Sequence, residues 1–489
     1  MKSLTLFAIL SIFLAGCGVN RELTRLPPPP RLSVLSVASS SVVKGRIDDL
    51  IADSLFPPSN VGIKVVSLTR GVPVYALNED MVFNPASNQK LFTSCTALTN
   101  LGPSYHFSTA VLVDTTRRRI LLKGRGDPLT STGDLDSLAR LIAPRLNGPS
   151  PWQVAVDASF FDDLFWGSGW TWDEEPAAYG MFITPITLNN NAIEVRVLPS
   201  AIPGTPPQVV IDPPTSYVSL ENTAVTVADS PTVRLHISRK WRERSNTITV
   251  AGQIKAGARG RTEQLSLWKP ELYAGTVFAE RLKAYGVAVA GEVHADTVTP
   301  GMMEFQRAEH GIDTVLTFMN KVSDNLSAEC MLKTTAAEKT GLPGSAENGV
   351  YLVNAMLAGF GVDTNRISVV DGSGLSRYDL TSSATIVRLL ARMYRDSLCF
   401  PLLYHALPIA GVDGTIGTRM RGTPAAGNLR AKTGSLGAVS ALSGYVQTAD
   451  GEMLAFSIMM QSFPGATRPY RIVQDGIGTI LATLKRGEY

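Results

Sequence analysis

The sequence is poor in the residues that bind metals or form disulfides. Its 489 residues include only four cysteines and five histidines. The cysteines beyond Cys17 have no CxxC spacing, and the histidines match no HExxH motif or other ligand cluster. The sequence therefore predicts no catalytic metal and no cofactor. Cys95, Cys330 and Cys399 are expected to be small, buried hydrophobic residues.

An excess of one charge and long apolar runs are also lacking. The net charge of +3 is small and spread along the chain, which argues against a nucleic-acid partner. Beyond the N-terminal residues, no stretch is apolar for long enough to cross a membrane. The hydrophobic content of 44% excludes a disordered chain, and the length suffices for two or three domains.

The N-terminus has the layout of an export signal. Lys2 precedes an apolar run over residues 4–15, which is too short for a membrane span and leads into small residues. Leu14-Ala15-Gly16-Cys17 resembles a bacterial lipobox, and this resemblance implies cleavage before Cys17 and lipidation of Cys17. An ordinary signal followed by an incidental cysteine is the alternative. The sequence thus predicts a signal peptide over residues 1–16.

A tether is predicted after this signal. Residues 17–44 are rich in proline and serine, including the run from Pro27 to Pro30, and this composition favours extended chain over a packed core. We therefore expect an exported, membrane-anchored lipoprotein that faces the periplasm or cell envelope.

The candidate nucleophile is Ser87, in Ser87-Asn88-Gln89-Lys90. Strand-like runs precede it and a helix-like stretch follows, and on a helix the i to i+3 spacing places both side chains on one face. The helix start adds free N–H groups and positive potential. A serine needs a base to become a good nucleophile, and lysine serves as a base when burial or a nearby cation lowers its pKa.

Two other Ser-x-x-Lys matches compete with this motif, at Ser41–Lys44 and Ser266–Lys269. Gly45 follows the first and Pro270 follows the second, so neither match is expected to open a helix. Ser87 is therefore the predicted nucleophile.

A second cation is predicted in Lys432-Thr433-Gly434-Ser435, which reads as a strand. Two more strands follow, around an Asp450-Gly451 turn. The lysine and threonine suit a carboxylate, and the glycine is expected to let substrate approach the backbone. The competing match, Lys339-Thr340-Gly341, ends a helical stretch, where glycine is a C-cap.

Ser323-Asp324-Asn325 is the third candidate element, between two helical stretches. A serine in such a loop can relay a proton to a leaving amine, and the asparagine amide can bind a substrate carbonyl. A plain helix cap is the alternative.

Together the motifs follow the order Ser-x-x-Lys, Ser-Asp-Asn, Lys-Thr-Gly of class A β-lactamases and penicillin-binding proteins. The long interval between Ser87 and Ser323 does not fit a compact β-lactamase. The chain instead resembles the class C low-molecular-mass penicillin-binding proteins, a D-alanyl-D-alanine carboxypeptidase/endopeptidase family. The further motifs that carry the resemblance are Gly124–Pro128, Asp157–Phe161, Trp170–Trp172, Ser323–Glu329, Asp371–Arg377 and Ala431–Ser435.

The resemblance implies an α/β fold with a split serine-transpeptidase (β-lactamase-like) domain, in which helices flank an antiparallel sheet, and two smaller inserted domains, one of them β-rich. The implied boundaries are 45–107 and 300–489 for the catalytic domain, 108–180 and 266–299 for inserted domain II, and 181–265 for the β-rich domain III. Helical stretches are read independently at 46–55, 87–100, 346–359, 382–396 and 470–485.

The same resemblance implies a serine DD-peptidase that acts on peptidoglycan peptides ending in D-Ala-D-Ala through an acyl-enzyme on Ser87, and that β-lactams inhibit. The expected catalytic residues are Ser87, Lys90, Ser323, Asn325 and Lys432. The expected substrate-binding residues are Thr433, Gly434, Ser435, Asp157 and Arg377.

Asp157 and Arg377 are expected, by this resemblance, to contact the zwitterionic end of a diaminopimelate side chain. A structural ion pair or a turn role is the alternative for each. A β-lactamase-like hydrolase and a catalytically idle peptidoglycan-binding lipoprotein remain as alternative functions. An idle protein would have little reason to keep all three motifs intact.

Overall fold

The computed structural model describes residues 41–52, 59–146, 148–229 and 234–489. The predicted signal peptide, Cys17 and most of the tether lie outside these residues. The predicted tether is too long, because helix α1 (Ser41–Ile51) begins inside it. Contrary to expectation, Gly45 does not prevent a helix at Ser41–Lys44. None of the helices in the described residues combines the length and apolar character needed to cross a membrane.

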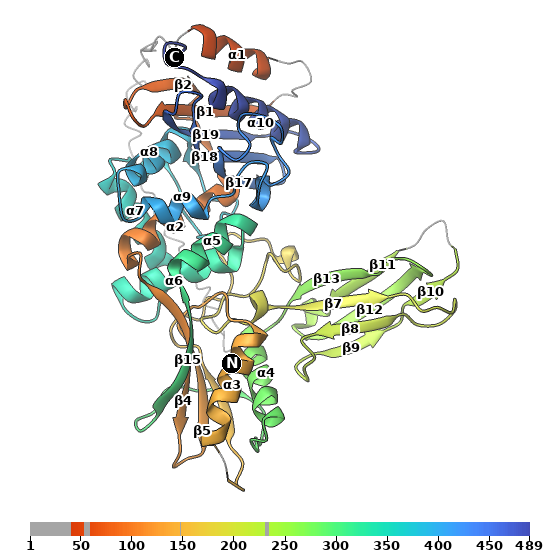
Figure 1. The fold of residues 1–489 in the computed structure, drawn as a ribbon. Helices are drawn as coiled ribbons and strands as arrows, with labels where there is room; N and C mark the ends of the chain where they lie inside the picture. Colours follow the sequence, from red (N-terminus) through yellow and green to blue (C-terminus); the bar gives the residue numbers. More distant parts are fainter. Residues whose placement is uncertain (1–40, 53–58, 147, 230–233) are drawn as a thin grey trace, which may run out of the picture. The chain divides into compact units, whose positions relative to one another are not determined.

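A five-stranded antiparallel sheet brings together both ends of the described chain (Figure 1). Its strands, in spatial order, are β17 (Arg430–Leu436), β18 (Val439–Gln447), β19 (Met453–Gln461), β1 (Asn60–Ser67) and β2 (Pro73–Leu77). The two strands predicted around Asp450-Gly451 are β18 and β19. Strand β17, which carries Lys432, is an edge strand of this sheet.

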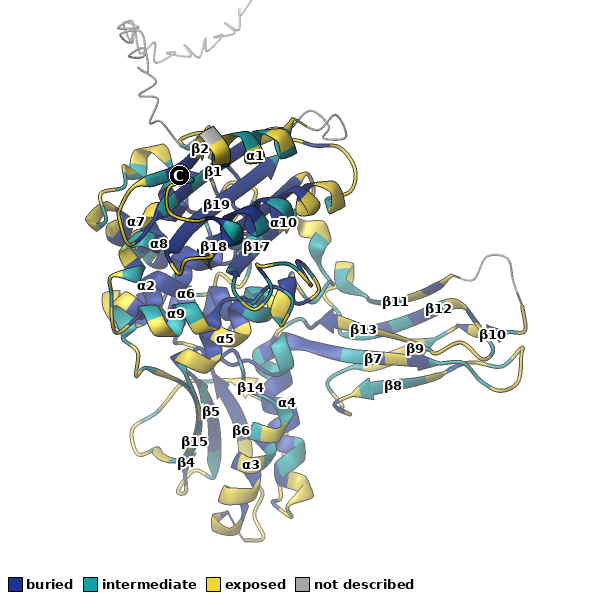
Figure 2. Ribbon diagram, turned by 45° about the horizontal axis from the view of Figure 1, so that its top comes forward, coloured by how far each residue is buried: buried dark blue, intermediate teal, exposed yellow. Residues whose placement is uncertain are grey.

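Different helices cover the two faces of this sheet. On β19, Leu454 and Phe456 pack in a core with α1 and α10 (Arg468–Thr483), whereas Met453 and Ala455 pack in another core with α8 (Ser383–Tyr394). Side chains alternate along a strand, so a strand covered on both faces is buried along its length, as β19 is from Met453 to Met460 (Figure 2). The structure thus confirms the predicted antiparallel sheet flanked by helices.

The other helices that surround the sheet pack mainly on the α8 side. These other helices are α2 (Gln89–Leu101), α5 (Ile312–Val322), α6 (Asn325–Thr340), α7 (Ala346–Gly359) and α9 (Phe400–Ala406). Two short strands, β3 (Val82–Phe83) and β16 (Thr381–Ser382), pair beside them.

A second sheet lies within the long interval between the first two motifs. Its order is β14 (His294–Ala295), β6 (Gln153–Asp157), β5 (Arg119–Gly124), β4 (His106–Asp114) and β15 (Met303–Gly311), and helices α3 (Thr132–Ile142) and α4 (Pro270–Ala284) pack against it. Strand β15 pairs with β4 along its length. Residues 303–311 therefore belong to this sheet, and we propose that the catalytic domain resumes after Gly311, not at residue 300.

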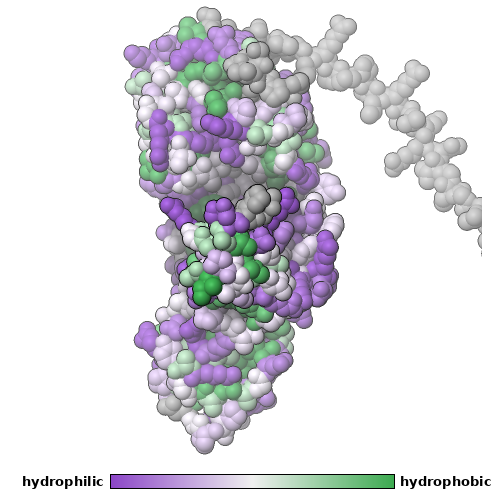
Figure 3. All heavy atoms as spheres, turned by 90° about the vertical axis from the view of Figure 1, so that its right-hand side faces the viewer, coloured by the Kyte–Doolittle hydropathy of each residue, from purple (hydrophilic) through white to green (hydrophobic). Residues whose placement is uncertain are grey.

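The remaining strands form a β-rich module. They are β7 (Ala192–Leu198), β8 (Gln208–Asp212), β9 (Ser219–Asn222), β10 (Val225–Val227), β11 (Leu235–Arg239), β12 (Thr247–Lys255) and β13 (Arg261–Ser266). In β12, Ile248 and Val250 are buried and alternate with more exposed residues. On the face shown in Figure 3, which looks onto this module, hydrophobic and hydrophilic side chains are intermixed. The assignment of this module to a domain over 181–265 stays a proposal.

Candidate active site

Ser87 lies on a tight turn at the start of a helix. The short 3-10 helix η1 (Ala86–Asn88) runs directly into α2. Ala86 has φ +45°, a left-handed conformation that is costly for a residue with a Cβ. The side chain of Asn84 accepts a hydrogen bond from the Ala86 N–H at 2.9 Å and helps to hold this turn. The sequence predicted the helix start, but not the strained residue before the serine.

Lys90 lies one turn along the helix, and its amine is completely buried. Its Nζ is 3.0 Å from Ser87 Oγ, 2.6 Å from Asn325 Oδ1 and 2.8 Å from the carbonyl oxygen of Ser373. The last two atoms can only accept hydrogen bonds. A neutral amine that donates to both therefore has its lone pair left for the Ser87 hydroxyl proton, which is the arrangement of a general base.

The pKa of Lys90 is lowered to about 8, mainly because burial disfavours its charge. Four carboxyl groups oppose this shift: Asp324, Asp371, Glu329 and Asp379. The pKa of Lys432 is lowered well below its usual value, by burial and by the charge of Lys90. We expected Lys432 to lower the pKa of Lys90. Burial lowers the pKa of both amines, and the repulsion between them adds to this effect.

Ser323 and Lys432 form a second serine–lysine pair. Ser323 ends α5 in a left-handed conformation, with φ +67°, and its Oγ accepts a hydrogen bond from Lys432 Nζ at 2.8 Å. Asp324 is the N-cap of α6, where it accepts from the Ser327 N–H at 2.6 Å. The predicted alternative of a helix cap therefore holds for the aspartate, while Ser323 faces the buried amine.

Asn325 is the first residue of α6 and connects Lys90 with the segment that contains Tyr179. Its Oδ1 accepts from Lys90, and its Nδ2 donates to the carbonyl oxygen of Tyr179 at 2.9 Å. Tyr179 lies in a segment that precedes the β-rich module. Sequence reasoning did not find Tyr179, because no local pattern connects it with Asn325.

The role expected for Gly434 is not what the structure shows. Gly434 is buried, and a Cβ built on it would lie 2.5 Å from the carbonyl oxygen of Pro85. The glycine therefore lets β17 pack against the turn that carries Ser87, and does not leave space for substrate. Thr433, the preceding residue, is more exposed, and its Oγ1 is 2.8 Å from the Oγ1 of Thr415.

Two cavities open on Ser87. One, of about 350 Å³, is lined by Ser87, Ser323, Thr415, Arg419, Thr433, Ser435 and Arg471. The other, of about 360 Å³, is lined by Ser87, Glu174, Tyr179, Ser323, Asn325, Gly374, Leu375, Arg377, Ser435, Leu436 and Gly437. Both cavities are lined by Ser87, Ser323 and Ser435, so they meet at the nucleophile.

Arg377 and Asp157, expected to act together, are separated in the structure. Arg377 lines the second cavity, and its Nη1 donates to the carbonyl oxygen of Gly437 at 2.9 Å. Asp157 is buried in β6, 3.4 Å from Lys123 Nζ, and lines neither cavity. The acid beside Arg377 is Glu174, whose pKa is raised by burial and lowered in part by Arg377. The sequence has an acid at position 157 and another at position 174, but it does not indicate which of them lines the cavity with Arg377.

The Asp-Gly-Ser-Gly loop lies behind Lys90. Glu329 accepts from the backbone N–H of Ser373 at 2.8 Å, and Asp371 accepts from that of Gly374 at 2.6 Å. These bonds fix the Ser373 carbonyl that accepts from Lys90. Glu329 and Asp371, which had no predicted role of their own, therefore meet at this loop.

The competing motifs lie away from these cavities. Ser266 ends strand β13, and Lys269 precedes α4, which begins at Pro270. Lys44 is exposed and pairs with Asp48. Gly341 is the C-cap of α6, as expected.

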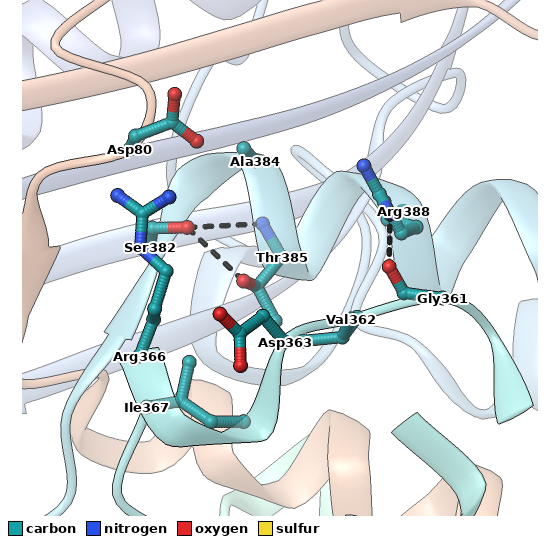
Figure 4. Close-up of a pocket in the computed structure, with 10 residues that line it drawn as sticks. All are labelled: Asp80, Gly361, Val362, Asp363, Arg366, Ile367, Ser382, Ala384, Thr385 and Arg388. Carbon is teal, nitrogen blue, oxygen red and sulfur yellow. Dashed lines mark hydrogen bonds between the residues drawn. The ribbon is translucent and has the colours of Figure 1, made fainter. Parts of the chain in front are cut away.

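A further cavity, of about 260 Å³, lies between η6 (Thr364–Arg366) and α8 (Figure 4). Its charged lining residues, Asp80, Asp363, Arg366 and Arg388, are exposed, and the N-terminus of α8 is already capped by Ser382. None of its ten lining residues belongs to the three motifs.

A family model described as the D-Ala-D-Ala carboxypeptidase 3 (S13) family matches residues 43–483. The chain belongs to this family. It is 34% identical over 482 residues to the D-alanyl-D-alanine carboxypeptidase of Actinomadura sp. (strain R39), which covers 94% of this chain and 88% of that protein. It is 26% identical over 414 residues to the D-alanyl-D-alanine carboxypeptidase DacB of Haemophilus influenzae, covering 81% and 84%.

Solved structures share the fold. The crystal structure of penicillin binding protein 4 (dacB) from H. influenzae matches with a TM-score of 0.79 at 23% identity, covering 90% of this chain and 99% of that chain. A structure of the same protein complexed with a β-lactam matches with a TM-score of 0.72 at 22% identity and covers 90% and 100%. The family and the activity predicted from the sequence are confirmed: the chain is a serine-type D-Ala-D-Ala carboxypeptidase, a hydrolase.

Gly374 provides a test of the packing behind the nucleophile. It has φ +80°, and a Cβ there would lie 1.9 Å from the carbonyl oxygen of Ala86. We expect Gly374→Ala to destabilise the protein by more than about 2 kcal/mol and to slow acylation, because the turn that holds Ser87 must move. Gly451→Ala is the matched control: its φ is +84° with nothing nearby, so it should cost only about 1 kcal/mol. Equal losses in urea unfolding would contradict the clash.

The pH dependence of acylation tests Lys90 as the base. Only the neutral amine accepts a proton, so the second-order rate of acylation should rise with pH up to about 8 and fall about tenfold per unit below that value. Lys90→Arg should lose the reaction by about 100-fold or more, since guanidinium does not deprotonate. Lys339→Arg, in the competing Lys-Thr-Gly, is the control. A rate that is flat from about pH 6 to pH 9 would require another base.

Proposed function

We propose that the enzyme cleaves D-alanyl-D-alanine peptides by acyl transfer through an ester on Ser87. Lys90 takes the Ser87 proton as Oγ attacks the carbonyl carbon between the two D-alanines. The bond to the D-alanine nitrogen then breaks, and water hydrolyses the ester. The observation that carries this proposal is the Lys90 amine, whose two other partners are obligate acceptors and whose lone pair is left for Ser87.

Ser323 is the proposed proton donor to the leaving nitrogen. Its Oγ lies between the cavity and the amine of Lys432, and the low pKa of that amine suits a group that gives and takes protons during turnover. We assign the oxyanion to the backbone N–H groups of Ser87 and Ser435, where one donor is typically worth about 3 kcal/mol. Asn325 orients the acyl side.

The cavity lined by Glu174 and Arg377 is the proposed site for the acyl part of the substrate. A carboxylate and a guanidinium together suit an amino acid side chain that ends in both an ammonium and a carboxylate. Such an end occurs in the diaminopimelate of peptidoglycan stems. We propose Glu174, and not Asp157, as the acidic residue of this site. The acyl part is the same in an uncross-linked stem and a cross-linked one, so we propose both carboxypeptidase and endopeptidase action.

Location in the cell envelope is part of this proposal. The apolar N-terminal run and the lipobox resemblance at Cys17 support export and lipid attachment, which would place the enzyme beside peptidoglycan. The folded residues would then reach the wall on the proline-rich tether.

Intact-mass analysis after incubation with a penicillin tests the nucleophile. We expect one penicillin mass per chain, located on the peptide that contains Ser87, because ring opening leaves the amine tethered and hinders water. Ser87→Ala should abolish labelling, whereas Ser266→Ala, in a competing Ser-x-x-Lys match, should leave it intact. Labelling of Ser87→Ala would disprove the assignment. An adduct that disappears within seconds would indicate a β-lactamase-like hydrolase instead.

Membrane fractionation tests the anchor. Cys17 should be the first residue of the mature protein and should carry acyl chains, each worth about 0.8 kcal/mol per buried CH₂, so the enzyme should sediment with membranes. Cys17→Ser should release active enzyme into the soluble exported fraction or leave it on an uncleaved signal. Cys95→Ser is a control for loss of a thiol. A soluble parent whose N-terminus lies after Cys17 would show that the lipobox match is accidental.

A further inference from the structure

Another cavity of about 260 Å³, here named the junction cavity, lies between segments that connect the second sheet with the β-rich module. Its lining comes from within residues 158–165 after β6, residues 182–185 before β7, and residues 268–271, where α4 begins. It shares no lining residue with the two cavities that contain Ser87. Pockets for drug-sized ligands begin at about 300 Å³, so the junction cavity suits a ligand group of a single ring.

Three aromatic side chains line the junction cavity and hold one another in place. Phe165, Phe182 and Trp268 contact each other edge to face, with ring centroids 5.0 to 5.5 Å apart. Phe182 is buried, whereas Phe165 is 40% exposed. An exposed ring that is fixed by its neighbours offers a preformed apolar surface to a ligand.

The backbone at Trp268 and Lys269 is also fixed. The side chain of Asn246 accepts a hydrogen bond from the Trp268 N–H at 2.9 Å and donates to the Trp268 carbonyl oxygen at 3.0 Å. The hydroxyl of Tyr217 donates to the Lys269 carbonyl oxygen at 2.8 Å. This part of the lining is therefore in place before any ligand binds, which lowers the entropy lost on binding.

Several polar groups of the junction cavity are free to bind a ligand. Asp163 and Lys269 are exposed, and among the described residues neither side chain has an ion pair or a hydrogen bond. The hydroxyl of Thr184 is buried and likewise has no partner in the described part of the chain. Asp162 differs, because its Oδ1 accepts from Lys333 Nζ at 2.6 Å. The free groups thus include an acceptor, a donor and a hydroxyl that is both.

The charges of this lining argue against a simple ion. Lys269 opposes a cation, whereas Asp163 and Glu271 oppose an anion. Burial raises the pKa of the Glu271 carboxyl, and the charge of Lys269 offsets part of this rise. A neutral ligand with hydroxyl groups suits both kinds of side chain, since a hydroxyl donates to a carboxylate and accepts from an ammonium. A sugar ring has such hydroxyls at its rim and C–H groups on its faces, which pack against aromatic rings.

We propose that the junction cavity binds one ring of the glycan strand to which peptidoglycan stem peptides are attached. Phe165 and Trp268 pack against the apolar face of the ring, and Asp163 and Lys269 bond to its hydroxyl groups. The proposal does not depend on the role of Ser87. It gives the enzyme a second point of attachment to its polymeric substrate, away from the bond that is cleaved.

Titration calorimetry of the full exported chain with β-1,4-linked tri-N-acetylglucosamine tests the proposal. We expect the trimer to bind, and Phe165→Ala and Asp163→Ala each to weaken binding about tenfold or more, through loss of the aromatic surface or of a charged acceptor. Ser87→Ala should bind the trimer as the parent does. Penicillin labelling of Ser87→Ala would refute the proposed function and leave this result unchanged.

Leu164→Ala is the matched control. Leu164 lies between the two tested residues, is 69% exposed and does not line the junction cavity. Its replacement should change the affinity for the trimer by less than about twofold, as expected for a surface substitution away from the site. If Phe165→Ala fails to fold, Asp163→Ala decides the question, because Asp163 is exposed and its side chain has no partner among the described residues.

Three results would overturn the proposal. The first is a parent enzyme that does not bind the trimer, or that binds it no more tightly than Phe165→Ala and Asp163→Ala do. The second is binding of free N-acetylglucosamine without binding of the trimer, which would indicate a small soluble sugar and not a strand. The third is tighter binding of cadaverine than of the trimer, which would indicate a site for a cation.

Discussion

Burial of the Lys90 amine is the constraint on which this site depends, since an ammonium removed from water must find acceptors or lose its proton. The structure supplies acceptors for the amine and also limits how far its pKa falls. Asn325 and the Ser373 carbonyl accept hydrogen bonds from the amine, and nearby carboxyl groups limit the fall of its pKa. Without those carboxyl groups the amine would be a weaker base, because a very low pKa means low proton affinity. With its pKa near 8, Lys90 remains basic enough to take a serine proton.

The carboxyl groups are themselves buried, so the same argument applies to them. Burial and Asp371 raise the pKa of Glu329 to about 7, and burial raises that of Asp379 well above its usual value. The cluster therefore does not carry its full negative charge near neutral pH. Glu329 also holds the backbone of the loop that presents Ser373. Positioning of Lys90 and control of its charge thus depend on the same few residues behind the nucleophile.

Sequence patterns predicted the parts of the site that are set locally. The i to i+3 spacing of Ser87 and Lys90 on a helix, and the position of Lys432 on a strand, follow from short-range rules, and the structure brings these residues together. Predictions that depended on distant packing were less successful. Asp157 is an acid in a matching motif, yet it lies in the second sheet, where it faces Lys123 of the neighbouring strand. Gly434 was expected to let substrate approach the backbone, but the turn at Pro85 occupies the space where a Cβ of residue 434 would lie. Glu174, Arg419 and Arg471 come from separate segments, and nothing near them in the sequence marks them as neighbours of Ser87.

The distribution of charge around Ser87 gives the substrate a direction. On one side, Arg419 and Arg471 face a cavity with no acid in its lining, whereas on the other Glu174 accompanies Arg377. On the proposed assignment of the two cavities, a peptide placed backwards would put a zwitterionic side chain against two cations and leave Glu174 without a positive partner from the ligand, and each mismatch costs free energy in a partly desolvated site. On the same assignment, the correct orientation places the scissile carbonyl over Ser87. Charge would then select the orientation before the chemistry begins, and the buried lysines proposed for proton transfer would not need to take part in that selection.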